Sequence, residues 1–346
     1  MEDFVLNEDL CMIAKEYQSI SAFDNTSVLI TGATGLIGSL LAKTLLKLNK
    51  NIKVITLVRD IDKARDIYGE DFDKIEYIQG DIINPIIYSG IVDYIFHCAS
   101  ITTSKLMVNS PVETLMVSID GTKNVLQFAK EKMVKSMVYM SSMEMYGTFT
   151  NIDHDITEHD LGYIDPLNIR SNYPESKRLC ENMCIAYKSE YGVPVKIARL
   201  AQTFGAGVLK NENRIFAQFA RSVINNRDIV LHTKGLSEGN YCYTRDTIKA
   251  LLLLLINGVD GEAYNISNPD AHTNIAKMAK MVADEIAQNR IQVVFDIPEK
   301  NIYGYASDTK MKLSSEKMQK LGWKPEVNLK ESYVRLIDSM RATNNF

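Results

Sequence analysis

Apolar residues along the first two hundred positions alternate between two periods. Short runs rich in β-branched residues recur, and longer stretches with apolar residues three or four apart lie between several of them. The short runs predict strands at residues 27–31, 53–58, 75–79, 92–99, 136–142 and 195–200. The longer stretches predict helices over residues 38–48, 112–132 and 175–191. This alternation is typical of a mostly parallel sheet with helices on both faces, so the sequence predicts a doubly wound α/β domain of the Rossmann type.

Residues 1–26 precede the first predicted strand and have the pattern of an amphipathic helix, for which Asn7 is the expected N-cap. One side of this helix carries Leu10, Ile13, Ala14 and Tyr17. We expect it to pack on the surface or to form a dimer contact.

The pattern becomes looser after about residue 204. It predicts a strand at 228–233, an apolar helix from Asp246, and helical stretches at 275–289 and 314–321. We therefore expect three parts. Residues 1–26 form a helical extension, residues 27–203 plus about 232–258 form the Rossmann domain, and about 204–231 plus 259–346 form a smaller, interleaved substrate-binding region.

Composition and charge exclude several classes of protein. The chain has 346 residues, of which 46% are hydrophobic, so a sizeable core can form. The net charge of -4 comes without a basic block, which argues against nucleic acid as a partner. The five cysteines are scattered without zinc spacing, so we expect a reducing compartment and no metal site. Cys180 and Cys184 are expected to be buried small hydrophobes.

Targeting signals are also missing from the expected places. The first residues are acidic and lack the basic start and apolar core of a signal peptide. The most apolar run, Ala250 to Ile256, is far shorter than the ~20 residues that cross a bilayer. We expect a cytoplasmic protein without a membrane partner.

The stretch "SVLITGATGLIGSLLAKTLLK" places Gly32, Gly35 and Gly38 between the first predicted strand and the first predicted helix. In a dinucleotide-binding turn the first glycine permits the bend, the second lets the backbone approach a pyrophosphate, and the third allows close packing of helix on strand. Amide groups at the helix start then bind the phosphates. A purely structural turn is the alternative, because glycine patterns also arise by accident.

The end of the second predicted strand bears on the choice between NAD and NADP. An acidic residue there would bind the 2′-hydroxyl group of NAD, but the chain has Val58 followed by Arg59. An arginine in this place favours the 2′-phosphate of NADP. The alternative is a solvated Arg59 with Asp60 on the ribose. Asp81, after the third strand, is expected to reach the adenine.

Tyr173 and Lys177 are four residues apart at the start of a predicted helix and therefore share one face. A lysine ammonium group and an oxidised nicotinamide would both favour the phenolate, so Tyr173 could accept a hydroxyl proton. The fifth predicted strand ends in "SSMEMYG", which offers Ser141 or Ser142 as a hydroxyl for the reacting oxygen, with Glu144 nearby.

Together, "TGATGLIG", "HCAS", "SSMEMYG", "YPESK" and "ARLAQTFG" resemble the extended short-chain dehydrogenase/reductase family, and within it the nucleotide-sugar epimerases, 4,6-dehydratases and UDP-glucuronate decarboxylases. The resemblance implies Ser142 as the catalytic hydroxyl, Tyr173 as the base, and Lys177 as the residue that lowers the pKa of Tyr173 and holds the nicotinamide ribose. It also implies a role for Glu144 in elimination or decarboxylation, and it brings Arg170 and Arg214 towards the substrate. The other expected cofactor contacts are Thr34, Leu36, Ile37, Ile82, Ala99 and Ser100, and the other expected substrate contacts are Thr103 and Gln202.

The chain departs from the family pattern at several positions. Gln202 replaces a common asparagine, Gly239 stands where an arginine usually binds the diphosphate, and Ser118 replaces another asparagine. Arg245 could compensate for Gly239, although a surface arginine is the expected interpretation.

The leading hypothesis is an NAD(P)-dependent oxidoreductase that acts on a nucleotide-activated sugar through a keto intermediate. One alternative is an NADPH-dependent reductase that converts a nucleotide-linked keto sugar to an alcohol or alditol. A more distant one is a non-catalytic NADP-binding scaffold. The resemblance also implies a homodimer.

Overall fold

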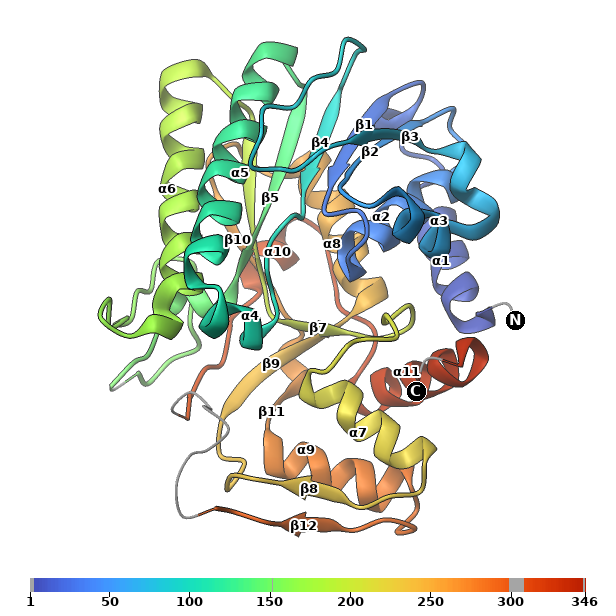
Figure 1. The fold of residues 1–346 in the computed structure, drawn as a ribbon, viewed down its shortest axis with the longest axis vertical. Coiled ribbons are helices and arrows are strands. Elements are labelled where there is room, and N and C mark those ends of the chain that lie inside the picture. The colour runs from blue at the N-terminus through green and yellow to red at the C-terminus, as the bar shows by residue number, and fades with distance from the viewer. Residues whose placement is uncertain (1–2, 151, 299–307, 345) are drawn as a thin grey trace.

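The computed structural model describes residues 3–150, 152–298, 308–344 and 346. Its centre is a seven-stranded sheet of order β10-β6-β5-β4-β1-β2-β3 in which every neighbouring pair is parallel. The strands are β1 Ser27–Thr31, β2 Lys53–Val58, β3 Glu76–Gln79, β4 Tyr94–His97, β5 Ser136–Ser142, β6 Val195–Leu200 and β10 Ala263–Ile266. The predicted doubly wound α/β fold is confirmed (Figure 1).

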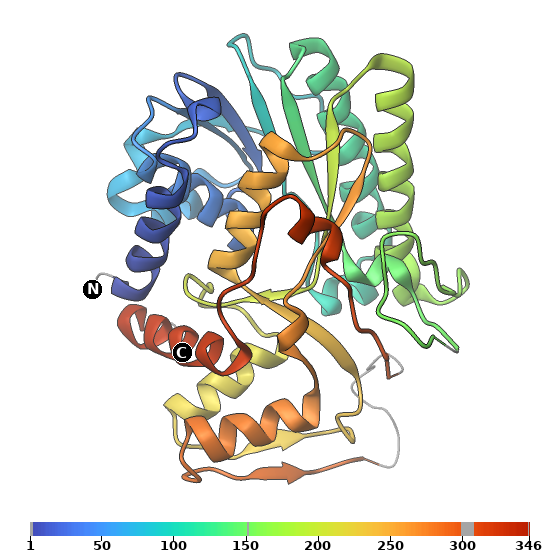
Figure 2. The same cartoon turned by 180° about the vertical axis from the view of Figure 1, so that it is seen from behind.

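Two cores lie on the two faces of this sheet. Val28 and Ile30 of β1 belong to one core and Leu29 to the other, because successive side chains of a strand point to opposite faces. The first face is covered by α1 Phe4–Tyr17, α2 Leu36–Lys47, α3 Ile61–Tyr68 and α8 Thr244–Asn257. The opposite face is covered by α5 Pro111–Lys132 and α6 Asn172–Tyr191, with the short helix α4 Ser104–Asn109 beside α5 (Figures 1 and 2). Burial on both faces explains why strands such as β1 and β2 carry apolar residues at successive positions instead of at every second one.

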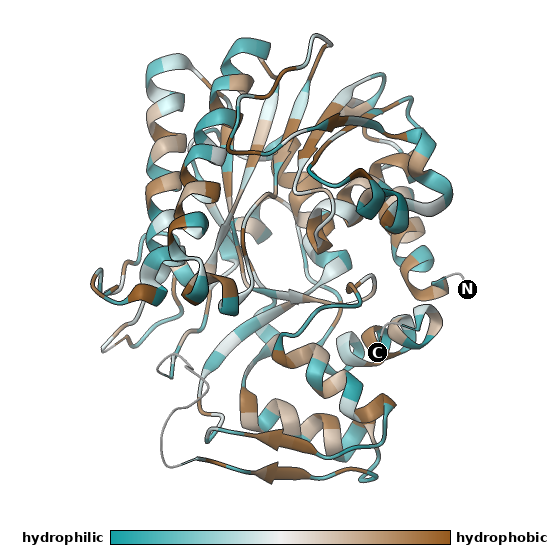
Figure 3. Cartoon of the chain, in the orientation of Figure 1, coloured by the Kyte–Doolittle hydropathy of each residue, from teal (hydrophilic) through white to brown (hydrophobic). Residues whose placement is uncertain are grey.

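The smaller region packs below the carboxyl ends of the sheet (Figure 1). Its strands are β7 Gln202–Phe204, β8 Ile229–Leu231, β9 Glu238–Tyr243, β11 His272–Asn274 and β12 Val293–Phe295. Its helices are α7 Ile215–Ile224, α9 Ile275–Met281 and α11 Leu329–Thr343, while α10 Glu316–Lys320 packs against β10. Phe204 stacks on Phe216 and also contacts Tyr333, which gives this region its own core. Strands β8 and β12 at its outer edge are largely hydrophobic (Figure 3).

The division of the chain into two regions differs from the expected one on both sides of residue 258. Residues 263–266, which we expected in the smaller region, form β10 and pair with β6 in the central sheet. Residues 238–243, which we expected in the Rossmann domain, instead pair with β7 and β11. The boundary between the two regions depends on how β7, β9, β10 and β11 pair. Hydrophobic periodicity does not predict which strands pair.

The N-terminal helix confirms the expected packing and corrects the expected N-cap. Asp3, not Asn7, is the N-cap, and its carboxylate accepts a hydrogen bond of 3.0 Å from the amide of Leu6. As expected, helix α1 packs on the surface: one side lies against α2, α8 and α11 of its own chain, and the other side is exposed. Ile13 and Tyr17 are buried, and the Tyr17 hydroxyl donates a 2.6 Å hydrogen bond to the Lys249 carbonyl of α8.

Candidate functional site

The glycine-rich turn lies between β1 and α2, next to the point where the strand order reverses from β1 to β4. Gly32 has φ +66°, and a Cβ atom there would lie 2.6 Å from the Ala99 amide nitrogen. A Cβ atom at Gly38 would lie 2.4 Å from the Gly32 carbonyl oxygen. Gly35 is the N-cap of α2. The turn therefore brings backbone unusually close to backbone at a helix N-terminus, which suits a bound pyrophosphate.

The other predicted cofactor contacts surround this turn. Thr34, Leu36 and Ile37 lie in the turn and the first residues of α2, while Ala99 and Ser100 follow β4 after Cys98. Ser100 Oγ is buried and has no hydrogen-bond partner within the described residues. Ile82 is buried against Gly121 of α5. The residues present fit a dinucleotide, because the glycine turn forms a helix N-terminus and Ser100 supplies a buried polar group without a partner among the described residues.

Arg59 and Asp81 face each other across the ends of β2 and β3. An Arg59 guanidinium nitrogen lies 3.6 Å from an Asp81 carboxylate oxygen, and the Arg59 side chain is mostly exposed. Asp60 caps α3, since its carboxylate accepts a hydrogen bond of 3.0 Å from the amide of Lys63. Arg59 and Asp81 therefore lie together where the adenosine end of a dinucleotide is expected.

Helix α6 carries Tyr173 and Lys177 beside the end of β5, and side-chain bonds anchor its start. Asn172 donates hydrogen bonds to the carbonyls of Met107 and Ile169 at 2.5 and 2.7 Å. Lys177 Nζ donates 2.8 Å to the Met140 carbonyl of β5 and lies 5.6 Å from the centre of the Tyr173 ring. These bonds hold both predicted catalytic side chains against the strand that ends at Ser142.

Burial governs the ionisation of this pair. It lowers the pKa of Lys177 to about 8. Burial also raises the pKa of Tyr173, as does the charge of Glu144, whereas a hydrogen bond with Ser142 and the charges of Arg170 and Arg214 lower it. Without a cofactor, burial therefore favours the protonated phenol. The expected phenolate requires an oxidised nicotinamide as well as the lysine, and it stays a prediction.

Ser141 and Ser142 lie on opposite sides of β5. Ser141 donates a hydrogen bond of 2.5 Å to the buried carboxylate of Glu181, which is also paired with Arg199. Ser142 lies by Tyr173, and its hydroxyl accepts a 3.2 Å hydrogen bond from the amide of Glu144. Of the two serines that the sequence offered, Ser142 is therefore the one at the candidate site.

Glu144 and Arg170 form an ion pair at this site, with a nitrogen–oxygen distance of 2.9 Å. The Arg170 guanidinium lies 5.9 Å from the centre of the Tyr173 ring. Both side chains are partly exposed. The structure thus brings a carboxylate, a guanidinium, a hydroxyl and a phenol together at the carboxyl end of β5.

The other predicted substrate contacts come from the smaller region and from the segment before α4. Arg214 precedes α7 and is held by Glu212 at 2.6 Å, and its charge acts on Tyr173. Gln202 begins β7 opposite Tyr241 of β9, and Thr103 is exposed before α4. Gly239 lies in β9, where a Cβ atom would be 3.3 Å from the terminal carbon of Met143.

The burial of Arg245 differs from the expected one. We predicted a surface arginine, but its side chain is 7% exposed and pairs with Asp9 of α1 at 3.1 Å. Asp9 and Arg245 are far apart in the sequence, so the residue types alone did not predict this ion pair. Ser118, another departure from the family pattern, is buried, and its carbonyl accepts a hydrogen bond from the Cys180 thiol.

His97 is a feature of the site to which the sequence analysis assigned no role. Its two ring nitrogens lie 2.7 Å from the Thr31 hydroxyl and 3.2 Å from the Thr122 hydroxyl, so it links β1, β4 and α5 beneath the glycine turn. Burial, helped by the charge of Lys177, lowers the pKa of His97 to about 3. The only signal in the sequence was the histidine within "HCAS" at the end of a strand.

The fold and the glycine turn define a nucleotide-binding enzyme class, and comparison with known proteins agrees. The model of the NAD dependent epimerase/dehydratase family matches residues 28–267. The chain belongs to this family and is an enzyme of the extended short-chain dehydrogenase/reductase type. Members of the family use NAD and act on nucleotide sugars as epimerases, dehydratases or decarboxylases.

Particular relatives cover most of the chain. UDP-glucuronic acid decarboxylase 1 of Danio rerio is 28% identical over 320 residues, which are 92% of this chain and 73% of the relative. The structure of UDP-glucose 4-epimerase from Thermotoga maritima matches with a TM-score of 0.78 and 20% identity, over 92% of this chain and all of that chain. UDP-glucuronic acid 4-epimerase from Bacillus cereus, in complex with UDP-glucuronic acid and NAD, matches with a TM-score of 0.75 and 19% identity over the same shares.

Among the described residues, no helix is both long enough and apolar enough to cross a bilayer.

Proposed function

We propose that this protein converts a nucleotide-linked sugar through a keto intermediate, and that decarboxylation of a nucleotide-linked uronic acid is the first reaction to test. The observation that carries the proposal is the convergence of Ser142, Tyr173 and Lys177 with the Glu144–Arg170 ion pair. The resemblance to UDP-glucuronic acid decarboxylases over most of the chain supports the choice of a uronic acid.

Each residue has a task in this proposal. Tyr173 accepts the proton of a sugar hydroxyl, and Ser142 hydrogen-bonds the same oxygen. Lys177 stabilises the phenolate once a cofactor is present. Arg170 offers a positive charge to a sugar carboxylate, and Glu144 takes or gives a proton at the neighbouring carbon. When bound, NAD supplies hydride acceptance and return, so the reaction consumes no cofactor overall.

The cofactor would be held by the turn around Gly32, Gly35 and Gly38 together with Ser100. Arg59 is the residue through which NADP could replace NAD, because its exposed guanidinium can bind a 2′-phosphate. Arg59→Ala should weaken NADPH binding and leave NADH binding nearly unchanged, as measured by fluorescence titration. If both affinities stay the same, Arg59 is a solvated side chain and NAD is the cofactor.

We also propose a homodimer formed through α5 and α6. These helices lie side by side on the outer face of the sheet (Figure 1), where Val112 and Met116 of α5 and Leu179 and Ile185 of α6 are exposed apolar residues. Exposed apolar side chains gathered on one face favour association. Light scattering should give twice the chain mass, and a monomer would refute the proposal.

The test begins with denaturing the purified protein and identifying any released nucleotide by mass. The protein is then incubated with UDP-glucuronic acid and the products are separated by chromatography. Loss of carbon dioxide supports decarboxylation, an isomer of equal mass indicates epimerisation, and loss of water indicates dehydration. Stoichiometric consumption of NADPH with a keto sugar would favour the reductase alternative.

A further inference from the structure

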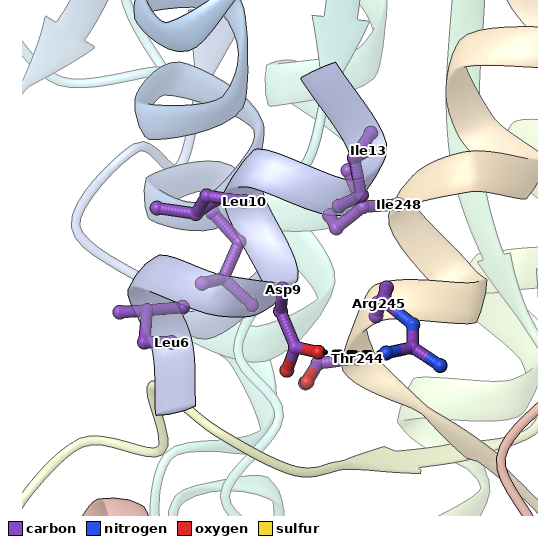
Figure 4. Close-up of a pocket in the computed structure, with 8 residues that line it drawn as sticks. Leu6, Asp9, Leu10, Ile13, Thr244, Arg245 and Ile248 are labelled. Atoms are coloured by element: carbon purple, nitrogen blue, oxygen red, sulfur yellow. Dashed lines mark hydrogen bonds and ion pairs between the residues drawn. The ribbon is translucent and has the colours of Figure 1, made fainter. Parts of the chain in front are cut away.

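One buried carboxylate of helix α1 binds side chains of β9, α8 and α11. Asp9 is 2% exposed and accepts hydrogen bonds from the Tyr243 hydroxyl at 2.6 Å, from Arg245 at 3.1 Å and from Arg335 at 2.7 Å. Figure 4 shows Asp9 directed from α1 towards Thr244 and Arg245 at the start of α8. The small cavity in this view has a volume of about 10 Å³, so the contact is closely packed. Removing the charge of Asp9 would leave two guanidinium groups without their buried partner.

The same hydrogen bonds reach a loop of the smaller region, residues 205–207. The Tyr243 hydroxyl, which donates to Asp9, lies 3.4 Å from the amide of Ala206 and accepts its hydrogen bond. The neighbouring Thr244 hydroxyl donates 3.2 Å to the Ala206 carbonyl. Gly205 lets the loop approach this closely, because a Cβ atom there would lie 2.3 Å from the Tyr243 ring.

Helix α1 also reaches this loop by two further routes. The Ser339 hydroxyl of α11 donates 2.5 Å to the Asp3 carboxylate and accepts a 3.1 Å hydrogen bond from the amide of Gly207. The Leu6 side chain lies beside Gly207, where a Cβ atom would be 3.4 Å from one of its methyl groups. Helix α1 therefore contacts Gly207 directly through Leu6, and it reaches Ala206 through Tyr243 and Gly207 through Ser339.

The loop joins two predicted substrate contacts. Gln202 begins the strand before it, and Arg214, whose charge acts on Tyr173, follows it. Helix α1 precedes the part of the chain that matches the family model, and α11 follows it. The brace on this loop, formed by Asp9, Tyr243, Thr244 and Ser339, therefore combines Asp9 and Ser339 from outside the matched region with Tyr243 and Thr244 from within it.

We infer that Asp9 is a positioning residue: through Tyr243 it holds residues 205–207 and so places Gln202 and Arg214 for the nucleotide part of the substrate. The glycine turn that would hold the cofactor is built from β1 and α2, and among the described residues the hydrogen bonds of Asp9 go to Tyr243, Arg245 and Arg335 and not to that turn. The inference rests on the proposed function only for the identity of the ligand.

The test compares Asp9→Asn with the control Glu8→Gln. Both carboxylates bind Arg335 at 2.7 Å, but Glu8 is exposed and makes no bond to Tyr243 among the described residues. Amide hydrogen exchange is followed by mass spectrometry in residues 203–214 and in residues 28–45. Binding of UDP is measured by calorimetry and binding of NADH by fluorescence. Tyr243→Phe removes only the linking hydroxyl and carries the test if Asp9→Asn does not fold.

In Asp9→Asn we expect faster amide exchange in residues 203–214 only. We also expect the UDP affinity of this variant to be about tenfold weaker and its NADH affinity to be unchanged. Glu8→Gln should behave as the wild type. Unchanged exchange and UDP binding would overturn the inference. So would a general rise in exchange together with weaker NADH binding, since α1 would then stabilise the whole domain. If the wild type does not bind UDP but exchange still rises only in the loop, the brace is supported and the proposed nucleotide substrate fails.

Discussion

The guanidinium of Arg170 lies 2.9 Å from the carboxylate of Glu144 and 5.9 Å from the centre of the Tyr173 ring. The two charges act on the Tyr173 phenol in opposite directions, because Glu144 raises its pKa and Arg170 lowers it. A change to either partner therefore alters the ionisation of Tyr173 as well as the local hydrogen bonding.

Glu144→Gln should lower the pKa of Tyr173, because Arg170 is then unopposed. If Glu144 transfers a proton during decarboxylation or elimination, turnover should fall by roughly 10²–10⁴-fold. Ultraviolet difference titration measures the pKa of the Tyr173 phenol, and product chromatography measures turnover. Glu175→Gln, which changes another carboxylate in the first turn of α6, is the control and should stay active. Full turnover in Glu144→Gln would exclude the elimination and decarboxylation hypotheses.

Tyr173→Phe should retain the fold and NAD binding but lose activity by roughly 10²–10⁴-fold, because it lacks the group that accepts the hydroxyl proton. Tyr191→Phe changes an exposed tyrosine at the far end of the same helix and should match the wild type. Activity is measured with UDP-glucuronic acid. A fully active Tyr173→Phe would favour the scaffold alternative or a different base.

Gly38→Ala should abolish cofactor binding, because the new Cβ atom would lie 2.4 Å from the Gly32 carbonyl oxygen and 2.9 Å from the Ala33 Cα atom. Both are backbone atoms, so the glycine turn itself must move. Gly80→Ala is the matched control, since the only close atom is a Leu57 methyl group at 3.6 Å. NADH fluorescence titration compares the two variants, and equal affinities would show that the turn does not hold the dinucleotide.

His97 should remain neutral well below the pH at which an ordinary histidine ionises, because burial lowers its pKa to about 3. Between pH 6.5 and 3 the unfolded chain binds this proton and the folded chain does not. This group therefore makes the free energy of unfolding fall as the pH falls through that window, by about 1.4 kcal/mol per pH unit.

Nuclear magnetic resonance of the imidazole group, assigned with His97→Gln, tests this directly. The difference in unfolding free energy between wild type and variant should also shrink towards acidic pH. Titration of the His97 resonance near pH 6 would contradict the structure.

The strands and the central helices could be predicted from sequence because their periodicity reflects which side chains face the core. Four of the six strands predicted before residue 204, including β1 and β5, have the predicted bounds. The glycine turn could be predicted for the same local reason, since strand, turn and helix are contiguous. The spacing of Tyr173 and Lys177 also placed both residues on one face of α6.

Contacts between residues far apart in the sequence decided the features of the fold and the site that the sequence did not predict. The sequence determined which residue types follow β1, β4 and β5, but only the folded chain selected Ser142 over Ser141, since Ser141 binds Glu181 on the other side of the strand. The N-cap of α1 was predicted wrongly because capping depends on where the helix starts, and packing set that start at Asp3. Arg245 was predicted to lie on the surface, and its buried pairing with Asp9 spans more than two hundred residues of sequence. Burial, which is a property of the whole fold, set the ionisation of Lys177 and His97, and no local pattern of residues encodes it.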